Sequence, residues 1–223
     1  LPSYFEVTND QRVIPFLTNY YIYMSKNIDK RPLYSWANAR GIEELIGIDW
    51  LYKMTQKEFL LTLGKKIISQ SIDWNEVFEN FPYTKPSSDY VSKKAFNIKK
   101  VLFYGRDFIA NYFNDTKCNK KRILKRNNHK FNKFYHLTHG VNLAMALKYP
   151  ALIGCFLDDT SAFELASAGY NSLMQNHGTA AGLFTCDEHL SGASPTQGIE
   201  LCTVSEAMFS FEKLYQTTYE NSW

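Results

Sequence analysis

The residues best suited to chemistry lie in one Gly/Ser/Thr-rich stretch, residues 178–202. It holds four of the 11 glycines, two of the four cysteines and the carboxylates of Asp187, Glu188 and Glu200. A loop with so many reactive side chains, followed by a strongly apolar segment, is typical of an active-site loop on a scaffold. We therefore expect the function of the chain to depend on this stretch.

Glu200 and Cys202 form a candidate metal-binding pair. Thr203 and Glu206 match a capping box, which predicts a helix from about Thr203 and an extended chain before it. Alternate side chains of an extended chain point to one side, so Glu200 and Cys202 can converge on one ion. A carboxylate with a thiolate suits zinc, with Zn–S near ~2.3 Å. The alternative is a buried structural cysteine beside a capping glutamate.

Glu188 is the candidate general acid. It lies in an Asp-Glu-His triplet that follows the apolar pair Leu183 and Phe184. An apolar wall favours the neutral carboxyl, which is the form that a general acid needs at neutral pH. The alternative is a solvated acidic turn in which Glu188 pairs with His189 or a lysine.

The scaffold that must position these side chains is predicted to be all-α. Apolar residues recur at helical spacing, and no run alternates convincingly as a strand. The predicted helices cover residues 12–24, 36–40, 43–54, 57–71 and 139–148, a segment through Ala162 and Leu173 that begins at a cap in 158–160, and the chain from about Thr203. Only Thr55 and Gln56 separate two of these helices, so the two should pack antiparallel.

A basic segment near the middle differs from the rest. It carries 13 lysines and arginines interleaved with Asn, Phe and Tyr, namely Lys93, Lys94, Lys99, Lys100, Arg106, Lys117, Lys120, Lys121, Arg122, Lys125, Arg126, Lys130 and Lys133. Clustered basic and aromatic residues can bind nucleic acid, but no such binding motif is present and a solvated insertion is the favoured interpretation. We therefore expect no nucleic-acid partner, and an atypical Lys/Asn-rich insertion at about 87–135.

Composition sets broad limits on the class of protein. With 223 residues, 45% hydrophobic and 16% aromatic, the chain can build a sizeable core, and its net charge is only +3. The four cysteines form no CxxC pair, which argues against a disulfide scaffold. No apolar run approaching the roughly 20 residues of a membrane span was recognised, so no membrane is expected. No leader segment is visible, and the compartment stays unassigned.

Four segments resemble one family. Residues 188–210 read Glu-His-Leu-Ser-Gly-x-Ser-Pro-Thr-Gln-Gly-x-Glu-Leu-Cys-x-Val-x-Glu-Ala-Met-Phe-Ser, which is similar to the signature of the β-L-arabinofuranosidase-like glycoside hydrolases (glycoside hydrolase family 127 and relatives). Residues 4–16, 31–40 and 139–148 resemble the same family. The resemblance covers roughly residues 1–83 and 137–215 and skips the basic segment, which is then either a lineage-specific surface loop or translated non-coding sequence.

The resemblance implies a fold, a cofactor and roles for individual residues. The fold would be an (α/α)6 barrel, and the cofactor a zinc ion held by one Glu and three Cys, one of which is the nucleophile. Glu188 would be the general acid/base, and Glu200 and Cys202 two of the zinc ligands. His139 would contact the sugar, Trp36 would form a stacking platform, and His177 would be a donor at the edge of the loop. Ordinary packing is the alternative for Trp36 and His177. The reaction would be retaining hydrolysis of an arabinose-containing oligosaccharide or glycan, and secretion is typical of such enzymes.

The chain departs from the family at the metal site. The other two zinc cysteines of the family form an adjacent pair, and Cys118, Cys155 and Cys186 offer no such pair. We therefore expect a partial catalytic barrel with half a zinc site and no nucleophile. Three hypotheses follow: a glycosidase by descent, a non-catalytic carbohydrate- or protein-binding remnant of the same fold, and a basic nucleic-acid-binding helical protein.

Overall fold

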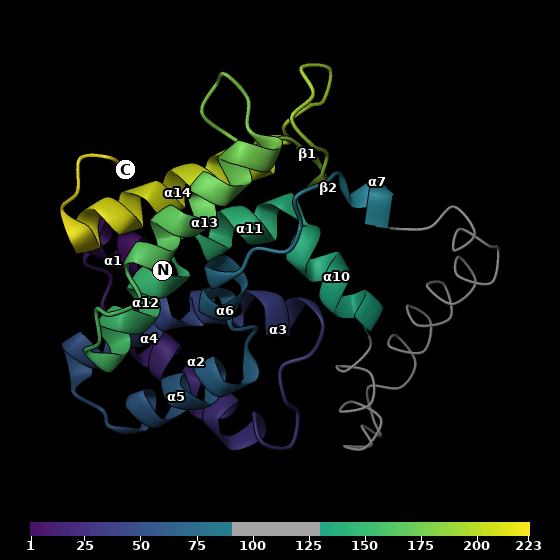
Figure 1. The fold of residues 1–223 in the computed structure, drawn as a ribbon. Coiled ribbons are helices and arrows are strands. Elements are labelled where there is room, and N and C mark those ends of the chain that lie inside the picture. The colour runs from purple at the N-terminus through teal and green to yellow at the C-terminus, as the bar shows by residue number, and fades with distance from the viewer. Residues whose placement is uncertain (91–129) are drawn as a thin grey trace.

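The computed structural model describes residues 1–90 and 130–223, and these residues are mostly helical (Figure 1). The first part contains α1 (Pro2–Thr8), α2 (Val13–Asn27), α3 (Trp36–Arg40), the 3-10 turn η1 (Gly41–Glu43), α4 (Glu44–Thr55), α5 (Phe59–Gln70), α6 (Trp74–Glu79) and α7 (Ser87–Tyr90). The second part contains α10 (Lys130–Thr138), α11 (Gly140–Ala146), α12 (Tyr149–Leu157), α13 (Glu164–His177), β1 (Cys186–Asp187), β2 (His189–Leu190) and α14 (Leu201–Thr218). The predicted all-α class is confirmed. The basic insertion predicted at 87–135 falls mostly outside the described residues, as do its basic side chains.

Most predicted helices are present with small shifts of their ends. The helix α3 has the predicted bounds, and α4 and α5 lie within two residues of theirs. The two helices pack against each other, and Gln56 turns the chain between them in the left-handed conformation with φ 53°. The antiparallel pair expected from the short link is therefore confirmed.

Three local predictions are wrong. Residues 139–148 do not form one helix that stops at Pro150, because α11 ends at Ala146 and Pro150 lies in the first turn of α12, where its missing N–H costs nothing. The cap predicted in residues 158–160 does not start α13, which begins at Glu164 after a turn. A short antiparallel hairpin, β1–β2, also interrupts the helical pattern.

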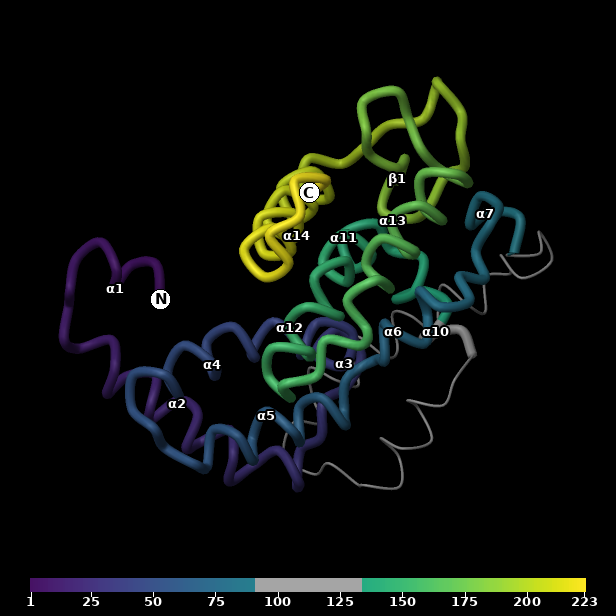
Figure 2. Tube along the Cα trace, turned by 60° about the vertical axis from the view of Figure 1, so that its left-hand side comes forward, coloured from purple at the N-terminus to yellow at the C-terminus, as the bar shows by residue number. Residues whose placement is uncertain are grey.

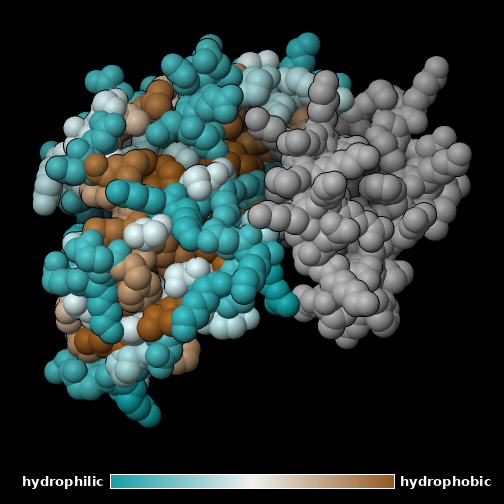
Figure 3. Space-filling view, turned by 90° about the horizontal axis from the view of Figure 1, so that it is seen from below, coloured by the Kyte–Doolittle hydropathy of each residue, from teal (hydrophilic) through white to brown (hydrophobic). Residues whose placement is uncertain are grey.

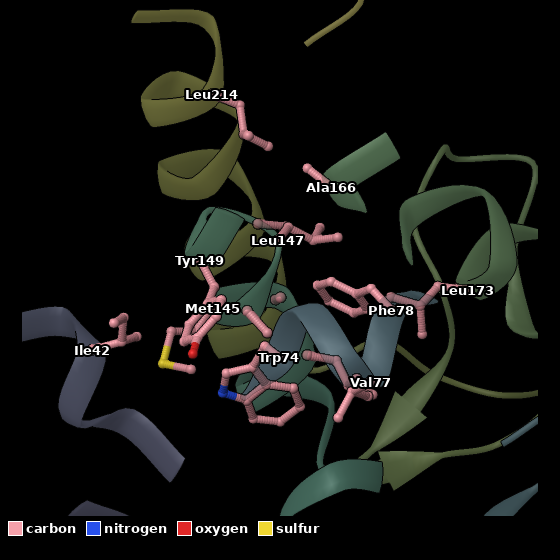
Figure 4. Packing of buried hydrophobic residues seen from close by; sticks show 14 of the residues in the cluster. Ile42, Trp74, Val77, Phe78, Met145, Leu147, Tyr149, Ala166, Leu173 and Leu214 are labelled. Atoms are coloured by element: carbon pink, nitrogen blue, oxygen red, sulfur yellow. The ribbon is translucent and has the colours of Figure 1, made fainter. Parts of the chain in front are cut away.

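The helices follow a curved path, from α1 and α2 through α4, α5 and α12 to α13, α11 and α14 (Figure 2). Two apolar clusters fill the interior. The smaller one joins α2, α4 and α5, and the larger one joins α6, α11, α12, α13 and α14 around Trp74, Phe78 and Tyr149 (Figure 4). The larger cluster supports the start of α11 and the loop after α13, which carry the candidate site.

The helix α14 packs against the larger cluster, with Val204 and Phe211 partly buried there, and leaves other apolar side chains exposed. Ala207, Ser210 and Leu214 are buried, whereas Met208 is 66% exposed. Other large apolar side chains are also exposed in the described residues, including Phe16 and Leu201, and the face drawn in Figure 3 has apolar patches between hydrophilic side chains.

Among the residues that the structure describes, one segment, Gly140–Leu157, meets the length and composition of a membrane span, although the sequence had led us to expect no such segment. Of this window 67% is buried inside the protein. It is also interrupted between α11 and α12 at Lys148, which is fully buried. These features are typical of a core segment of a globular fold.

Candidate functional site

The loop between α13 and α14 presents Glu188 at the tip of a tight hairpin. Asp187 pairs with His189 in the β1–β2 ladder, so Glu188 alone makes the turn. Its backbone adopts φ 61°, a left-handed conformation that is uncommon for a residue with a side chain and recurs at functional sites. The side chain is exposed, whereas Leu183 and Phe184 are buried in the core. The prediction that an apolar wall surrounds the Glu188 carboxylate is therefore wrong.

The hairpin is tied to the start of α11 by its backbone. The amide of Gly140 donates a hydrogen bond of 2.8 Å to the carbonyl oxygen of Glu188, and His139 and His189 form an isolated antiparallel bridge. These contacts join residues 139–148 and 188–210, two of the segments that resemble the family. They place His139 beside the hairpin.

His177 anchors the loop from inside. It is fully buried, and its Nδ1 accepts a hydrogen bond of 3.0 Å from the amide of Gly192. Its Nε2 therefore carries the proton and donates to the carbonyl oxygen of Tyr83, 2.7 Å away. The prediction that His177 is a donor to substrate is wrong, because backbone groups of the protein occupy both ring nitrogens.

Glu200 and Cys202 do converge, although the capping box that predicted their conformation is absent. Glu200 is the N-cap of α14, with φ −63° and ψ 140°, and α14 starts at Leu201 instead of near Thr203. The thiol of Cys202 donates a hydrogen bond to Glu200 Oε2 over 3.3 Å. Loss of hydration raises the pKa of Cys202, and the hydrogen bond to the Glu200 carboxylate raises it further.

The capping partners predicted at Thr203 and Glu206 have other contacts. Thr203 Oγ1 is hydrogen-bonded to Cys186 Sγ at 3.0 Å, and Glu206 forms an ion pair with Lys148. Neither side chain closes the first turn of α14.

A carboxylate and a thiol in contact match the donor types that bind zinc, so the pair fits half of the expected site. Among residues 1–90 and 130–223, no group of three His, Cys, Asp or Glu side chains lies close enough to hold a metal ion. Cys186 is not a third ligand on this geometry: it is fully buried, and its thiol contacts Thr203.

Aromatic and imidazole rings from four elements meet at the hairpin. We call Trp36, Tyr135, His136, His139 and His189 the ring cluster. The Trp36 ring centroid lies 4.8 Å from that of His136 and 5.0 Å from that of His139, and both pairs are edge-to-face. Tyr135 lies 4.6 Å from His189. The cluster joins α3, α10, the start of α11 and β2.

The imidazoles of this cluster are held neutral. Burial, the positive charge of Arg40 and His189 lower the pKa of His136 to about 4. The pKa of His139 is also lowered to about 4, mainly by burial and further by His189 and Arg40. Burial lowers the pKa of His189 against the opposing effect of Glu188 and Glu200. Both carboxylates therefore act electrostatically on the ring cluster.

Of the six predicted site residues, contacts join Trp36, His139 and the Glu188 hairpin in one group and Glu200 with Cys202 in another, Glu200 acts electrostatically on His139 and His189, and His177 is left out. One face of Trp36 is covered, because the guanidinium carbon of Arg40 lies 4.6 Å from its ring centroid. The sequence analysis missed Arg40, Tyr135, His136 and His189 as neighbours of the site. Arg40 and His189 lie inside the family-like segments, which was a usable signal, whereas Tyr135 and His136 were assigned to the edge of the insertion.

No protein-family model, no curated protein and no solved structure matches this chain.

Proposed function

We propose that this chain is part of a glycoside hydrolase of the β-L-arabinofuranosidase-like kind, built on an (α/α)6 barrel. Its reaction would be retaining hydrolysis of β-L-arabinofuranosides or related glycosides in an oligosaccharide or glycan. The helical architecture is compatible with such a barrel. The exposed apolar side chains of Leu201 and Met208 on α14 support it, since neighbouring helices in a barrel would cover them.

One observation carries the proposal. The amide of Gly140 and the carbonyl oxygen of Glu188 are hydrogen-bonded at 2.8 Å, so the expected sugar-contacting histidine and the expected acid/base belong to one rigid unit. Trp36 reaches the same unit through its contact with His139. Residues chosen on separate segments of the sequence would not be expected to meet unless they served one site.

Glu188 would act twice. Exposed at the hairpin tip, its carboxyl group would first protonate the leaving glycosidic oxygen, and its carboxylate would then take a proton from the water that releases the sugar. A cysteine thiolate would attack the anomeric carbon in the first step, and the resemblance implies that this cysteine belongs to an adjacent pair, which the present sequence does not contain.

Glu200 and Cys202 would hold zinc as two of its ligands. Zinc, when bound, would keep thiol ligands deprotonated at neutral pH. The half-buried Glu200 carboxylate already accepts a hydrogen bond from the Cys202 thiol. Exchanging this proton for a metal ion would leave both donor atoms in place.

The second candidate function is a non-catalytic carbohydrate- or protein-binding domain of the same fold. It is favoured by the donor set, since Glu200 and Cys202 are only two ligands and no third joins them in the part of the chain that the structure describes. The third hypothesis, nucleic-acid binding, depends on basic residues outside the described residues.

Hydrolysis of an aryl β-L-arabinofuranoside by the full-length gene product, with zinc supplied, separates the two candidates. We expect Glu188→Gln to lower kcat at least about a hundredfold, because general acid–base catalysis is worth that much. Asp187→Asn is the matched control, since Asp187 is the exposed neighbour on the same hairpin, and it should retain most of the activity. No hydrolysis by the zinc-loaded protein, or equal loss in both variants, would refute the enzyme proposal.

A further inference from the structure

Arg40, at the end of α3, is fixed in place by two contacts. Its Nε donates a hydrogen bond of 2.8 Å to Asn142 Oδ1, and its guanidinium carbon lies 4.6 Å from the centroid of the Trp36 ring. Asn142 is fully buried and is itself fixed, because its Nδ2 donates to the carbonyl oxygen of His136 over 3.1 Å. Asn142 and the Trp36 ring therefore set the orientation of the guanidinium group.

The other end of this guanidinium is not used. Neither terminal nitrogen of Arg40 has a hydrogen-bond or ion-pair partner among residues 1–90 and 130–223, and the residue is exposed. The acid on which Arg40 acts most clearly, Glu43, is already paired with Lys148 at 2.7 Å. A planar group with two outward nitrogens matches the two oxygens of a carboxylate.

The charge of Arg40 stands out in its surroundings. The neighbouring rings of His136 and His139 are buried and neutral, so they add no positive charge at neutral pH. Burial raises the pKa of Tyr135, Glu188 raises it further and Arg40 lowers it, so both charges act on this ring. The ring cluster thus has one cation, Arg40, and one anion, Glu188, within electrostatic reach of the same tyrosine.

We propose that Arg40 binds the carboxylate of an acidic sugar unit, a uronate, in the ligand whose glycosidic bond lies at Glu188. The sugar part rests on the proposed function, and the carboxylate part rests on the guanidinium. Trp36, which is 39% exposed, lies against the guanidinium, and the half-buried Tyr135 contacts Trp36 edge-to-face. Exposed aromatic surface beside the cation suits the C–H groups of a sugar ring, which a small anion lacks.

Binding of a matched pair of ligands tests the proposal without any need for turnover. Methyl β-D-glucuronide and methyl β-D-glucoside differ only in the carboxylate, and calorimetric or NMR titration at low salt measures both. The glucuronide should bind at least about tenfold more tightly, since hydrogen bonds to charged groups contribute that much. Arg40→Gln should abolish the difference, and Arg40→Lys, which keeps the charge but not the planar pair of donors, should reduce it.

Arg12→Gln is the control, because the Arg12 side chain is 88% exposed and pairs with Asp10 just before α2. It should leave the preference unchanged, and the thermal midpoints of all variants verify folding. The proposal is overturned if the two glycosides bind with equal affinity or if neither binds. It is also overturned if Arg40→Gln keeps the full preference for the glucuronide. Acetate or inorganic phosphate binding as tightly as the glucuronide overturns it too, since the site would then bind any anion. Discrimination by Arg40 in a protein that hydrolyses no glycoside would refute the proposed function and leave the carboxylate part of this inference standing.

Discussion

The amide of Gly140 donates a hydrogen bond to the carbonyl oxygen of Glu188 across 2.8 Å. This bond ties the first residue of α11 to the tip of the β1–β2 hairpin, 48 positions later in the numbering. It lets a rigid helix in the core set the position of an exposed loop residue. The candidate site therefore depends on close packing under the hairpin as well as on its functional side chains.

Gly140→Ala should disrupt this packing. A Cβ at position 140 would lie 2.1 Å from Cys186 Sγ and 2.6 Å from Cys186 Cβ, so either the helix or β1 must move. We expect a loss of about 1–3 kcal/mol in the free energy of unfolding, measured by urea denaturation. Gly198→Ala is the control, since its Cβ would meet only the flexible Asp187 carboxylate at 3.0 Å. Equal stability of the two variants would contradict the packing argument.

The capping box shows where sequence reasoning was misled. Thr203 and Glu206 have the spacing that caps a helix locally, but their partners in the fold are Cys186 and Lys148. These contacts join residues far apart in the sequence, and a local pattern contains no information about them. The helix consequently starts at Leu201, and Cys202 meets Glu200 from inside the first turn.

The same limit explains which site residues were predicted. Glu188, Glu200 and Cys202 could be selected from their chemistry and from a long motif, and the helices from their apolar period. His136 could not be selected, because its place in the site depends on contacts with Ser35 and Trp36 about a hundred positions earlier. His177 was selected wrongly, since a histidine at the edge of a loop looks the same whether it faces solvent or backbone.

Reactivity of Cys202 should depend on Glu200. Loss of hydration raises the pKa of the Cys202 thiol, and the Glu200 carboxylate, which accepts a hydrogen bond from the thiol, raises it further and disfavours the thiolate. Glu200→Gln should therefore lower the pKa of Cys202 and speed its alkylation by iodoacetamide at pH 7–8, because the thiolate is the nucleophile. Mass spectrometry reads the rate for each cysteine, and Cys155, which is also exposed, serves as an internal reference.

The same alkylation measurement, repeated with zinc present, tests metal binding. If Glu200 and Cys202 hold the ion, zinc should protect Cys202 and not Cys155 in the native protein, and the protection should weaken in Glu200→Gln. Equal protection of both cysteines by zinc would exclude Glu200 and Cys202 as metal ligands. So would an alkylation rate of Cys202 that is the same in the wild-type chain and in Glu200→Gln.

Stability should fall in mild acid because of the ring cluster. His136 and His139 have pKa values of about 4 in the folded protein, whereas an unfolded histidine binds a proton near pH 6.5. The unfolded chain thus gains protons first, so this contribution is complete above pH 6.5 and is lost as the pH falls toward 4. The slope is on the order of 1 kcal/mol per pH unit for each histidine.

Urea midpoints measured from pH 7.5 to 4.5 test this prediction. His136→Asn should be less stable at pH 7.5, since it loses buried ring contacts, but its stability should fall less steeply with acid. A parallel decline of the variant and the wild-type chain would show that His136 is not held neutral. The comparison of slopes separates titration from packing, because packing loss is the same at every pH.

A buried cation connects the first half of the fold to the last helix. Lys148 is fully buried just before α12. It pairs with Glu43 at 2.7 Å and with Glu206 on α14, and its ammonium group donates to Ser210 Oγ over 3.3 Å. Burial raises the pKa of Glu43 against the opposing effect of Lys148. Two partly buried carboxylates thus depend on one lysine.

Lys148→Met should destabilise the protein by about 3–5 kcal/mol, because it leaves the Glu43 and Glu206 carboxylates without their cation. Urea denaturation measures this loss, and Lys53→Met is the matched control: Lys53 makes an exposed i,i+4 pair on α4, for which about 0.5 kcal/mol or less is expected. Adding Glu43→Gln and Glu206→Gln to Lys148→Met should recover part of the loss, since neutral amides are cheaper to leave unpaired than charges. A triple variant as unstable as Lys148→Met would mean that the lysine acts through its aliphatic packing and not through its charge.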